Sequence, residues 1–311
     1  MLYKIILMII GFVLLVKGAD FVIKGASDIA KKFHLSQMLI GIVIVGIGTS
    51  LPEIIVTIES TLRGNPDIII GNSIGSCICN LLLVIGIASV CNPLKIDNKI
   101  LQVHLPVSAF TILMLAIFCN FGKGNFIISK TEALTLLILA IIYMIYTVRE
   151  GKEKAEEDEN NKKSSIFVIL LYLSLGVVGL KFGADFVVSG AVAIAEFFGV
   201  SESVISMTIV AIGTSLPEIV TSIIATIKKE SDLAIGNVIG SNIFNICLLP
   251  GIGAMIKSIN YDLGFNKSLI FLLMVTMYML IFDLFRNRRI ISRNHGVIFI
   301  LLFCLYVSCL F

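Results

Sequence analysis

The stretch that decides the fold is present twice. Residues 44–54 read IVGIGTSLPEI, and residues 209–219 read IVAIGTSLPEI, an offset of 165 positions. Two further motif pairs keep this offset: GADFV at 18–22 and 183–187, and GNSIGSCICN at 71–80 with GNVIGSNIFN at 236–245. Chance similarity between apolar helices could align Ile with Val, but it would not align Thr-Ser-Leu-Pro-Glu and Gly-Asn in register. The chain therefore contains an internal duplication.

The composition is that of an integral membrane protein. Hydrophobic residues make up 57% of the 311 residues, charged residues only 14%, and the mean hydropathy is +1.01. A membrane span needs roughly 20 apolar residues, so the chain can hold about ten spans and has no room for a sizeable soluble domain. The net charge of +3 is too weak to indicate a nucleic-acid partner. The seven cysteines lie almost wholly in apolar runs without CxxC pairs, so neither a disulfide framework nor a zinc site is expected.

Apolar runs divide the chain into ten expected spans. These are residues 3–30, 37–61, 68–90, 101–120, 131–148, 165–195, 203–227, 233–256, 267–285 and 291–311. The longest polar interruption, REGKEKAEEDENNKK at 149–163, reads as a solvated linker between a first unit, 1–148, and a second, 164–311. Most Lys and Arg residues outside the spans fall in loops on the linker side. The positive-inside rule therefore predicts a cytoplasmic linker and both termini outside.

Each half has five expected spans, and five is an odd number, so the second half enters the membrane from the opposite side. The expected fold is an all-α membrane protein with ten transmembrane helices in two inverted five-helix repeats, with interrupted helices at the midplane. This is the architecture of many secondary transporters, whose sites lie at the repeat interface.

The duplicated GTSLPE motifs put one carboxylate, Glu53 or Glu218, in the middle of a span, where charge is costly. Pro52 and Pro217 lack a backbone N–H, so we expect the helices to break and to leave free carbonyls around Gly48–Thr49 and Gly213–Thr214. In the second motif Ser76 and Asn80, like Ser241 and Asn245, are spaced to share a helix face. Oxygen ligands of these kinds favour a hard cation such as Ca²⁺ or Na⁺ over zinc or copper.

A function of a different class is an intramembrane aspartyl protease that uses Asp20 and Asp185 as a dyad, because two carboxylates in apolar helices can share a proton. This hypothesis leaves the GTSLPE pair without a purpose, and the chain has no Gly-x-Gly-Asp sequence. We favour a structural or hinge role for the two aspartates, and we expect no enzymatic activity.

Paired GTSLPE motifs, each followed by GN-x-IGS-x-I-x-N, closely resemble the two alpha repeats of the cation/calcium exchanger family, here 41–86 and 206–251. The length and the short linker resemble its prokaryotic sodium/calcium exchangers. The resemblance implies a Ca²⁺ site made by Glu53, Glu218 and the carbonyls of Thr49 and Thr214. It implies flanking Na⁺ sites completed by Ser50, Ser76, Ser215, Ser241 and the carbonyl of Ala211, with Asn80 and Asn245 lining the middle.

The resemblance also implies that the first and sixth spans slide across the rest of the protein to switch access. No cofactor and no obligatory protein partner are expected; the partners are the transported cations and the lipid bilayer, in a prokaryotic inner membrane. One position departs from the family, since Asn245 stands where well-studied sodium/calcium members carry Asp. Two carboxylates neutralise one Ca²⁺ but not three Na⁺. Exchange against Na⁺ is the leading hypothesis, and exchange against H⁺ carried by Glu53 and Glu218 is the alternative.

Overall fold

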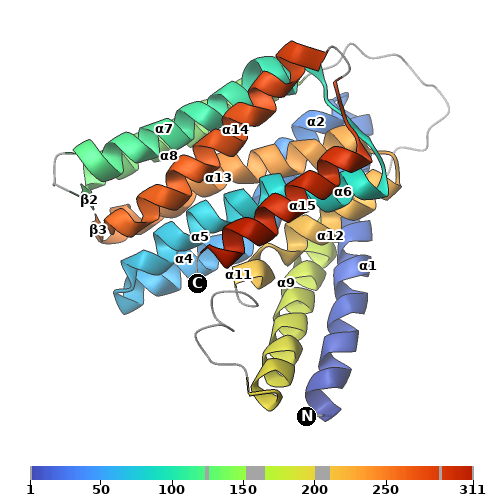
Figure 1. Ribbon diagram of the computed structural model, residues 1–311. Helices are drawn as coiled ribbons and strands as arrows, with labels where there is room; N and C mark the ends of the chain where they lie inside the picture. Colours follow the sequence, from blue (N-terminus) through green and yellow to red (C-terminus); the bar gives the residue numbers. More distant parts are fainter. Residues whose placement is uncertain (1, 123–125, 152–164, 200–210, 287–288, 310–311) are drawn as a thin grey trace.

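The computed structural model describes residues 2–122, 126–151, 165–199, 211–286 and 289–309. Within these residues the protein is helical apart from four two-residue strands (Figure 1). Seven helices are long and apolar enough to cross a membrane, and the bent pair Gln37–Thr49 and Leu51–Arg63 makes an eighth if it is one span. A multi-pass membrane protein, as the composition predicted, is therefore confirmed.

The first half contains these elements: α1 (Leu2–Phe33), α2 (Gln37–Ile40), η1 (Gly41–Val45), α3 (Gly46–Thr49), α4 (Leu51–Arg63), α5 (Pro66–Ile78), η2 (Cys79–Val84), α6 (Ile85–Cys91), β1 (Leu94–Lys95), η3 (Ile100–His104), α7 (Leu105–Phe121), β2 (Ile127–Ile128) and α8 (Lys130–Glu150). The turns η1, η2 and η3 are π-helical and continue the helices that follow or precede them.

The second half contains α9 (Ile166–Phe197), α11 (Ala211–Thr214), α12 (Leu216–Ile227), α13 (Ser231–Ile256), β3 (Ile259–Asn260), η5 (Leu263–Phe265), α14 (Asn266–Arg286), β4 (Ile290–Ile291) and α15 (Arg293–Ser308). The seventh expected span, 203–227, begins outside the described residues, and the tenth corresponds to the 16-residue helix α15. The count of ten spans and the inversion of the repeats stay predictions.

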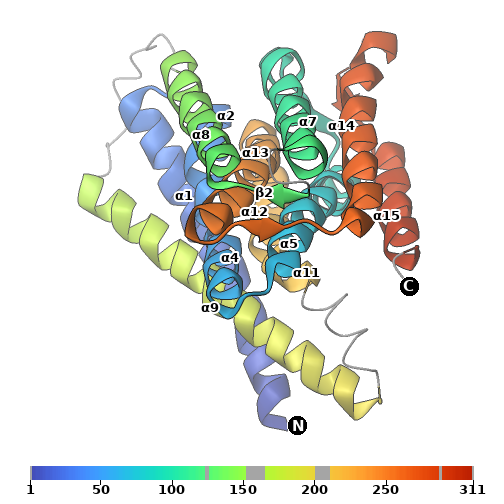
Figure 2. The same cartoon turned by 90° about the vertical axis from the view of Figure 1, so that its left-hand side faces the viewer.

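The two longest helices, α1 and α9, pack antiparallel and cross each other in the lower part of Figure 2. Glycines let their backbones touch: a side chain at Gly11 would meet the carbonyl of Gly183, and one at Gly18 would meet the carbonyl of Gly176. Small residues at such crossings are how helices approach closely inside a membrane, where lipid tails supply no hydrophobic drive.

The middle of the protein is formed by the broken helices and by α5 and α13. Helix α13 is buried along most of its length and packs against α5, α8 and η1. A side chain at Gly236 would collide with the carbonyl of Met38, and one at Gly240 with Ile42. These glycines therefore let α13 pack directly against α2 and η1, the helical turns that precede the GTSLPE segment of the first half.

Short strand pairs group the loops at two faces of the protein. Strand β1 pairs with β4 at one face, and β2 pairs with β3 at the other. Ser36 donates its N–H to the carbonyl of Gly151, the last described residue at the start of the linker, and Lys99 lies 3.8 Å from Glu150. We call the face with Ser36, Gly151, β1 and β4 the linker face, and the face with β2 and β3 the opposite face.

Candidate ion-binding site

Each GTSLPE motif forms a break between two helices. Ser50 joins α3 to α4 and Ser215 joins α11 to α12, both with ψ close to 0° (φ −83° and ψ 4°; φ −87° and ψ 3°). Pro52 and Pro217 lie in the first turn of the following helix, where a missing N–H costs nothing. The interruption that the sequence predicted at Gly48–Thr49 therefore lies one residue later, at the serine, and bends the first helix pair by 40°.

The two glutamates follow these breaks directly, in the first turns of α4 and α12. Both are fully buried. Among the described residues, three of the four carboxylate oxygens have no hydrogen-bond partner: Oε1 and Oε2 of Glu53 and Oε2 of Glu218. The first turn of a helix carries partial positive charge, which favours a carboxylate there, but it does not replace the lost hydration. The site therefore has oxygen acceptors available for a cation.

The serine at the helix break of the first half forms a hydrogen bond with the glutamate of the second half. Ser50 donates its hydroxyl to Glu218 Oε1 at 3.1 Å. The equivalent serine, Ser215, has a buried hydroxyl with no partner among the described residues. The two motifs are the same in sequence, yet their hydrogen bonds differ.

Two asparagines of the second motif, Asn72 and Asn237, accept hydrogen bonds from the threonines of the GTSLPE motifs. Thr49 Oγ1 donates to Asn237 Oδ1 at 3.1 Å, and Thr214 Oγ1 donates to Asn72 Oδ1 at 3.4 Å. The offset of 165 residues relates the two donors and also the two acceptors, so both bonds run from one half to the other. Asn237 also donates to Ser222 Oγ at 2.9 Å, which fixes the orientation of its amide.

The two serines of the second motif complete the network. Ser241 Oγ donates to the carbonyl of Gly46 at 3.2 Å and lies 3.5 Å from Thr49 Oγ1. Ser76 Oγ donates to Asn72 Oδ1 at 3.4 Å. Ser241 therefore contacts the first broken helix directly, and Ser76 bonds to the asparagine that accepts from Thr214.

The central asparagines differ from each other. Asn80 lies in the π-helical turn η2, a departure from α-helix that is frequent at functional sites, and donates to Asn242 Oδ1 at 3.1 Å. Asn245, its equivalent in the second half, is buried, and its Oδ1 and Nδ2 both lack partners among the described residues. Its backbone carbonyl accepts a bond of 2.7 Å from Ser73. The side-chain amide of Asn245 therefore makes no described hydrogen bond, and its helix, α13, packs against α4 and α12, which carry the two glutamates.

Two threonines were missed by the sequence analysis. Thr57 and Thr221 are fully buried, and among the described residues their hydroxyls have no hydrogen-bond partner. Thr57 follows Glu53 by four residues and Thr221 follows Glu218 by three, so each shares a helix face with its glutamate. That spacing was available in the sequence, but only the unsatisfied hydroxyl distinguishes these residues from ordinary packing threonines.

The remaining candidates lie as follows. Ala211 is the first residue of α11, and its side chain is outside the described set. Asp20 does not pair with Asp185: Asp20 lies 2.7 Å from Lys228, and Asp185 lies 2.8 Å from Lys181. Because α1 and α9 run antiparallel with Gly18 beside Gly176, the two aspartates are displaced along the pair, and the protease dyad is wrong.

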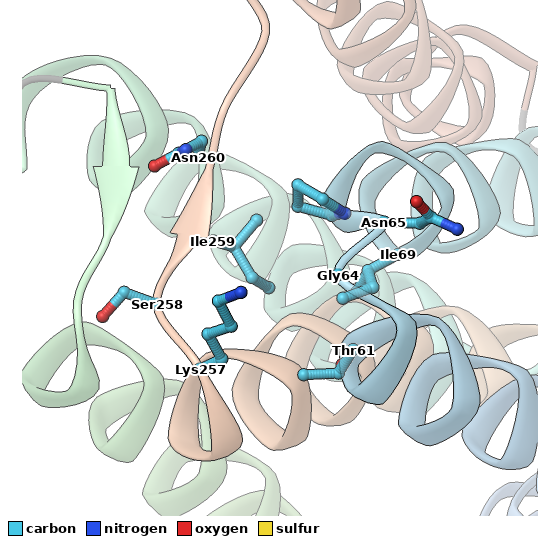
Figure 3. Close-up of a pocket in the computed structure, with 9 residues that line it drawn as sticks. Thr61, Gly64, Asn65, Ile69, Lys257, Ser258, Ile259 and Asn260 are labelled. Carbon is cyan, nitrogen blue, oxygen red and sulfur yellow. The ribbon is translucent and has the colours of Figure 1, made fainter.

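The pocket shown in Figure 3 is separate from these residues. It lies at the opposite face, between the end of α4 and strand β3, and is lined by Thr61, Gly64, Asn65, Pro66, Ile69, Lys257, Ser258, Ile259 and Asn260. Lys257 lies at the carboxyl end of α4, where a cation stabilises the helix dipole. In the described part of the chain no group of three or more His, Cys, Asp or Glu side chains is placed to hold a metal ion.

Comparison with known proteins decides the family. The sodium/calcium exchanger protein family matches residues 3–149 and 168–311 of the chain. The chain belongs to the sodium/calcium exchanger family. Within this family, it is 34% identical over 302 residues to an uncharacterised membrane protein of Methanocaldococcus jannaschii, covering 97% of this chain and 96% of that protein.

Two proteins named sodium/calcium exchangers are similar to this chain over nearly its full length. The chain is 27% identical to the sodium/calcium exchanger MaX1 of Methanosarcina acetivorans over 352 residues, covering 98% of each protein. The solved structure of the sodium-calcium exchanger NCX_Mj, soaked with zero Na⁺ and Ca²⁺, has a TM-score of 0.85 and 32% identity, covering 99% of both chains. The resemblance drawn from the GTSLPE and GN motifs is therefore confirmed, and two of these three similar proteins are named sodium/calcium exchangers.

Proposed function

We propose that the protein is a secondary antiporter that exchanges Ca²⁺ for Na⁺ across the membrane by alternating access. One observation carries the proposal: two fully buried carboxylates, Glu53 and Glu218, keep oxygens without partners at the ends of two broken helices. A buried carboxylate without a cation is costly, and two carboxylates that share one site also repel each other; Ser50, three residues before Glu53, reaches Glu218 Oε1 at 3.1 Å. A bound Ca²⁺ removes both penalties at once.

Competition for the same oxygens couples the two ions. We propose that Glu53 and Glu218, with the carbonyls of Thr49 and Thr214, hold Ca²⁺. The other proposed ligands contribute to Na⁺ sites or line the middle: Ser50, Ser76, Ser215, Ser241, Asn80, Asn245 and the carbonyl of Ala211. Ca²⁺ and Na⁺ both prefer such oxygens, so one ion leaves when the other binds. An empty site carries two unneutralised charges, which opposes the switch of access unless ions are bound.

The inverted repeat is part of the proposal, with units 1–148 and 164–311, alpha motifs 41–86 and 206–251, and the linker 149–163 between them. Two observations support it. The family matches the chain in two separate segments, and the Thr49–Asn237 and Thr214–Asn72 bonds are related by the sequence offset. We propose further that the linker face is cytoplasmic and that both termini lie outside, on the positive-inside argument.

A second candidate is exchange of Ca²⁺ against H⁺. Asn245 favours it, because an amide in the middle of the site leaves two carboxylates as the acidic ligands identified there. Two negative charges can be balanced by one Ca²⁺, by two Na⁺ or by two protons on Glu53 and Glu218.

The deciding experiment uses purified protein in sealed vesicles. Ca²⁺ uptake is followed first with an outward Na⁺ gradient at equal pH and then with an outward H⁺ gradient without Na⁺. We expect uptake driven by the Na⁺ gradient. Uptake driven only by the H⁺ gradient would show that H⁺, and not Na⁺, is the coupling ion.

The matched control for the site is a pair of glutamate variants. Glu53→Gln removes a proposed ligand, whereas Glu59→Gln alters an exposed glutamate on the same helix, paired with Arg63. We expect Glu59→Gln to retain uptake and Glu53→Gln to lose it. Full uptake in Glu53→Gln, or no uptake by the unaltered protein with either gradient, would refute the proposed Ca²⁺ site.

A further inference from the structure

An ion pair on the linker face joins the α1–α9 pair to the rest of the protein. Asp20 on α1 lies 2.7 Å from Lys228, the residue directly after α12. Nearby, Ser27 donates its hydroxyl to Glu230 at 3.0 Å. These contacts fix α1 against the end of the helix that carries Glu218.

The sequence offset assigns each of these charged residues an equivalent in the other half. Asp185 on α9 is equivalent to Asp20, and Arg63 at the end of α4 is equivalent to Lys228. These equivalents are not joined to each other: Asp185 pairs with Lys181 on its own helix, and Arg63 pairs with Glu59 on its own helix at 3.8 Å. Asp20 and Lys228 therefore form an ion pair between two helices, whereas their equivalents, Asp185 and Arg63, each form an ion pair within their own helix.

The two local partners, Lys181 and Glu59, have no charged equivalents in the other half, although Asp20 has Lys17 and Lys24 at helical spacing on its own helix. The positions equivalent to Lys181 and Glu59 are Val16 and Ile224, neither of which carries a charge. A charged side chain near lipid is costly without a partner. Lys181 and Glu59 give Asp185 and Arg63 such a partner while those two residues are apart.

We propose that Asp20–Lys228 and Asp185–Arg63 are alternating latches. Asp20–Lys228 closes in the conformation described here and opens in the other, in which Asp185 leaves Lys181 and pairs with Arg63 at the opposite face. Asp20, Lys228, Asp185 and Arg63 are then positioning residues for the exchange reaction, because they act through the position of the α1–α9 pair. The inference rests on the proposed alternating access.

Partly exposed ion pairs contribute little each, so the latches bias an equilibrium and do not lock it. A contribution of this size shifts the populations of two conformations by about two- to fivefold. Ser27 and Glu230 have no charged or hydroxyl equivalents, since Val192 and Asn65 occupy those positions. The linker-face latch therefore has the additional hydrogen bond, which favours the described conformation.

The test cross-links each latch with a short bifunctional thiol reagent in reconstituted protein whose exposed cysteines, Cys91, Cys304 and Cys309, are replaced by Ser. One protein carries Asp20→Cys and Lys228→Cys, and the other carries Asp185→Cys and Arg63→Cys. We expect both pairs to cross-link, and each cross-link to stop Ca²⁺ exchange until it is cleaved. Absence of any 63–185 cross-link in protein that exchanges Ca²⁺ would overturn the proposal.

Matched variants test the direction in which each ion pair shifts the two conformations. In the 20–228 cysteine protein, Arg63→Gln removes the competing latch and should raise the rate of the 20–228 cross-link about two- to fivefold, whereas Glu59→Gln frees Arg63 and should lower it. In the 63–185 protein, Lys228→Gln should raise the cross-linking rate. Equal rates in all these variants would refute the latches.

The readout separates the two proposals. Cross-linking does not require Ca²⁺ transport. If both pairs cross-link but the unaltered protein exchanges no Ca²⁺, the proposed function fails and the latches stand. If exchange is intact and 63–185 never cross-links, the latches fail and the proposed function stands.

Discussion

The two GTSLPE motifs have the same sequence but different surroundings. Glu218 accepts a hydrogen bond from Ser50 at 3.1 Å, whereas both oxygens of Glu53 and the hydroxyl of Ser215 are unpartnered among the described residues. Identical local sequence cannot produce this difference, so it comes from how the helices of one half are positioned against the other. A site built from two equal motifs can therefore hold two unequal conformations, which is what an alternating transporter requires.

The largest expected effect follows from removing either carboxylate. Glu53→Gln and Glu218→Gln each leave one negative charge to balance a divalent ion in a buried site, and we expect each to weaken Ca²⁺ binding by at least about 100-fold. Ca²⁺ titration of purified protein by calorimetry measures this loss. A large loss in only one of the two variants would show that the carboxylates do not share one Ca²⁺.

The serines test the difference between the motifs more directly. Without ions, Ser50→Ala leaves Glu218 Oε1 unpartnered and should destabilise the described conformation by about 1.5–3 kcal/mol, since its bond goes to a charged group. Ser215→Ala removes a hydroxyl that bonds to nothing described and should be close to neutral. Thermal unfolding in detergent without Ca²⁺ compares the two variants. Equal destabilisation would show that the asymmetry is absent from the protein in solution.

The asparagines that hold the threonines give a smaller difference of the same kind. Asn237 is fully buried and bonds to Thr49 and Ser222, whereas Asn72 is half-buried and its bond to Thr214 is longer. We expect Asn237→Ala to lower the unfolding free energy by about 1 kcal/mol more than Asn72→Ala. Chemical unfolding of both variants measures this difference. A larger loss in Asn72→Ala would contradict the ranking.

The central asparagines allow a third carboxylate to be added. Asn245→Asp breaks no side-chain bond, and the additional buried charge should require about one further Na⁺ or H⁺ per Ca²⁺. The measurement is the Na⁺ ratio at which net Ca²⁺ flux reverses, with the pH varied in parallel. Asn80→Asp is the control, because it places an acceptor against Asn242 Oδ1 and should lower stability instead. An unchanged reversal ratio in Asn245→Asp would show that residue 245 does not set the stoichiometry.

The sequence predicted the membrane class, the duplication and the residues near the broken helices, because Pro, Gly and buried Glu have strong local consequences. It did not predict Asn237 or Asn242 as partners of Thr49 and Asn80. Those contacts depend on where α13 crosses the first half. The pairing of Asp20 was also unexpected, since the sequence offers Lys17 three residues away, whereas the structure pairs it with Lys228 on another helix. Partners from distant segments depend on packing geometry, which local spacing does not encode.

One contact in the middle of the protein has a consequence for how such a chain can change over time. Cys77 donates its thiol to the carbonyl of Asn242 at 3.5 Å, and Asn242 donates its amide to the carbonyl of Cys77 at 3.3 Å. The two residues occupy equivalent positions in the two halves, because the sequence offset of 165 relates them. A position that touches its own equivalent lies on the two-fold axis of the proposed repeat. In a dimer of two identical halves, one side chain would have to fit against itself there. A fused gene removes that constraint, so the axis can accept a thiol on one side and an amide on the other.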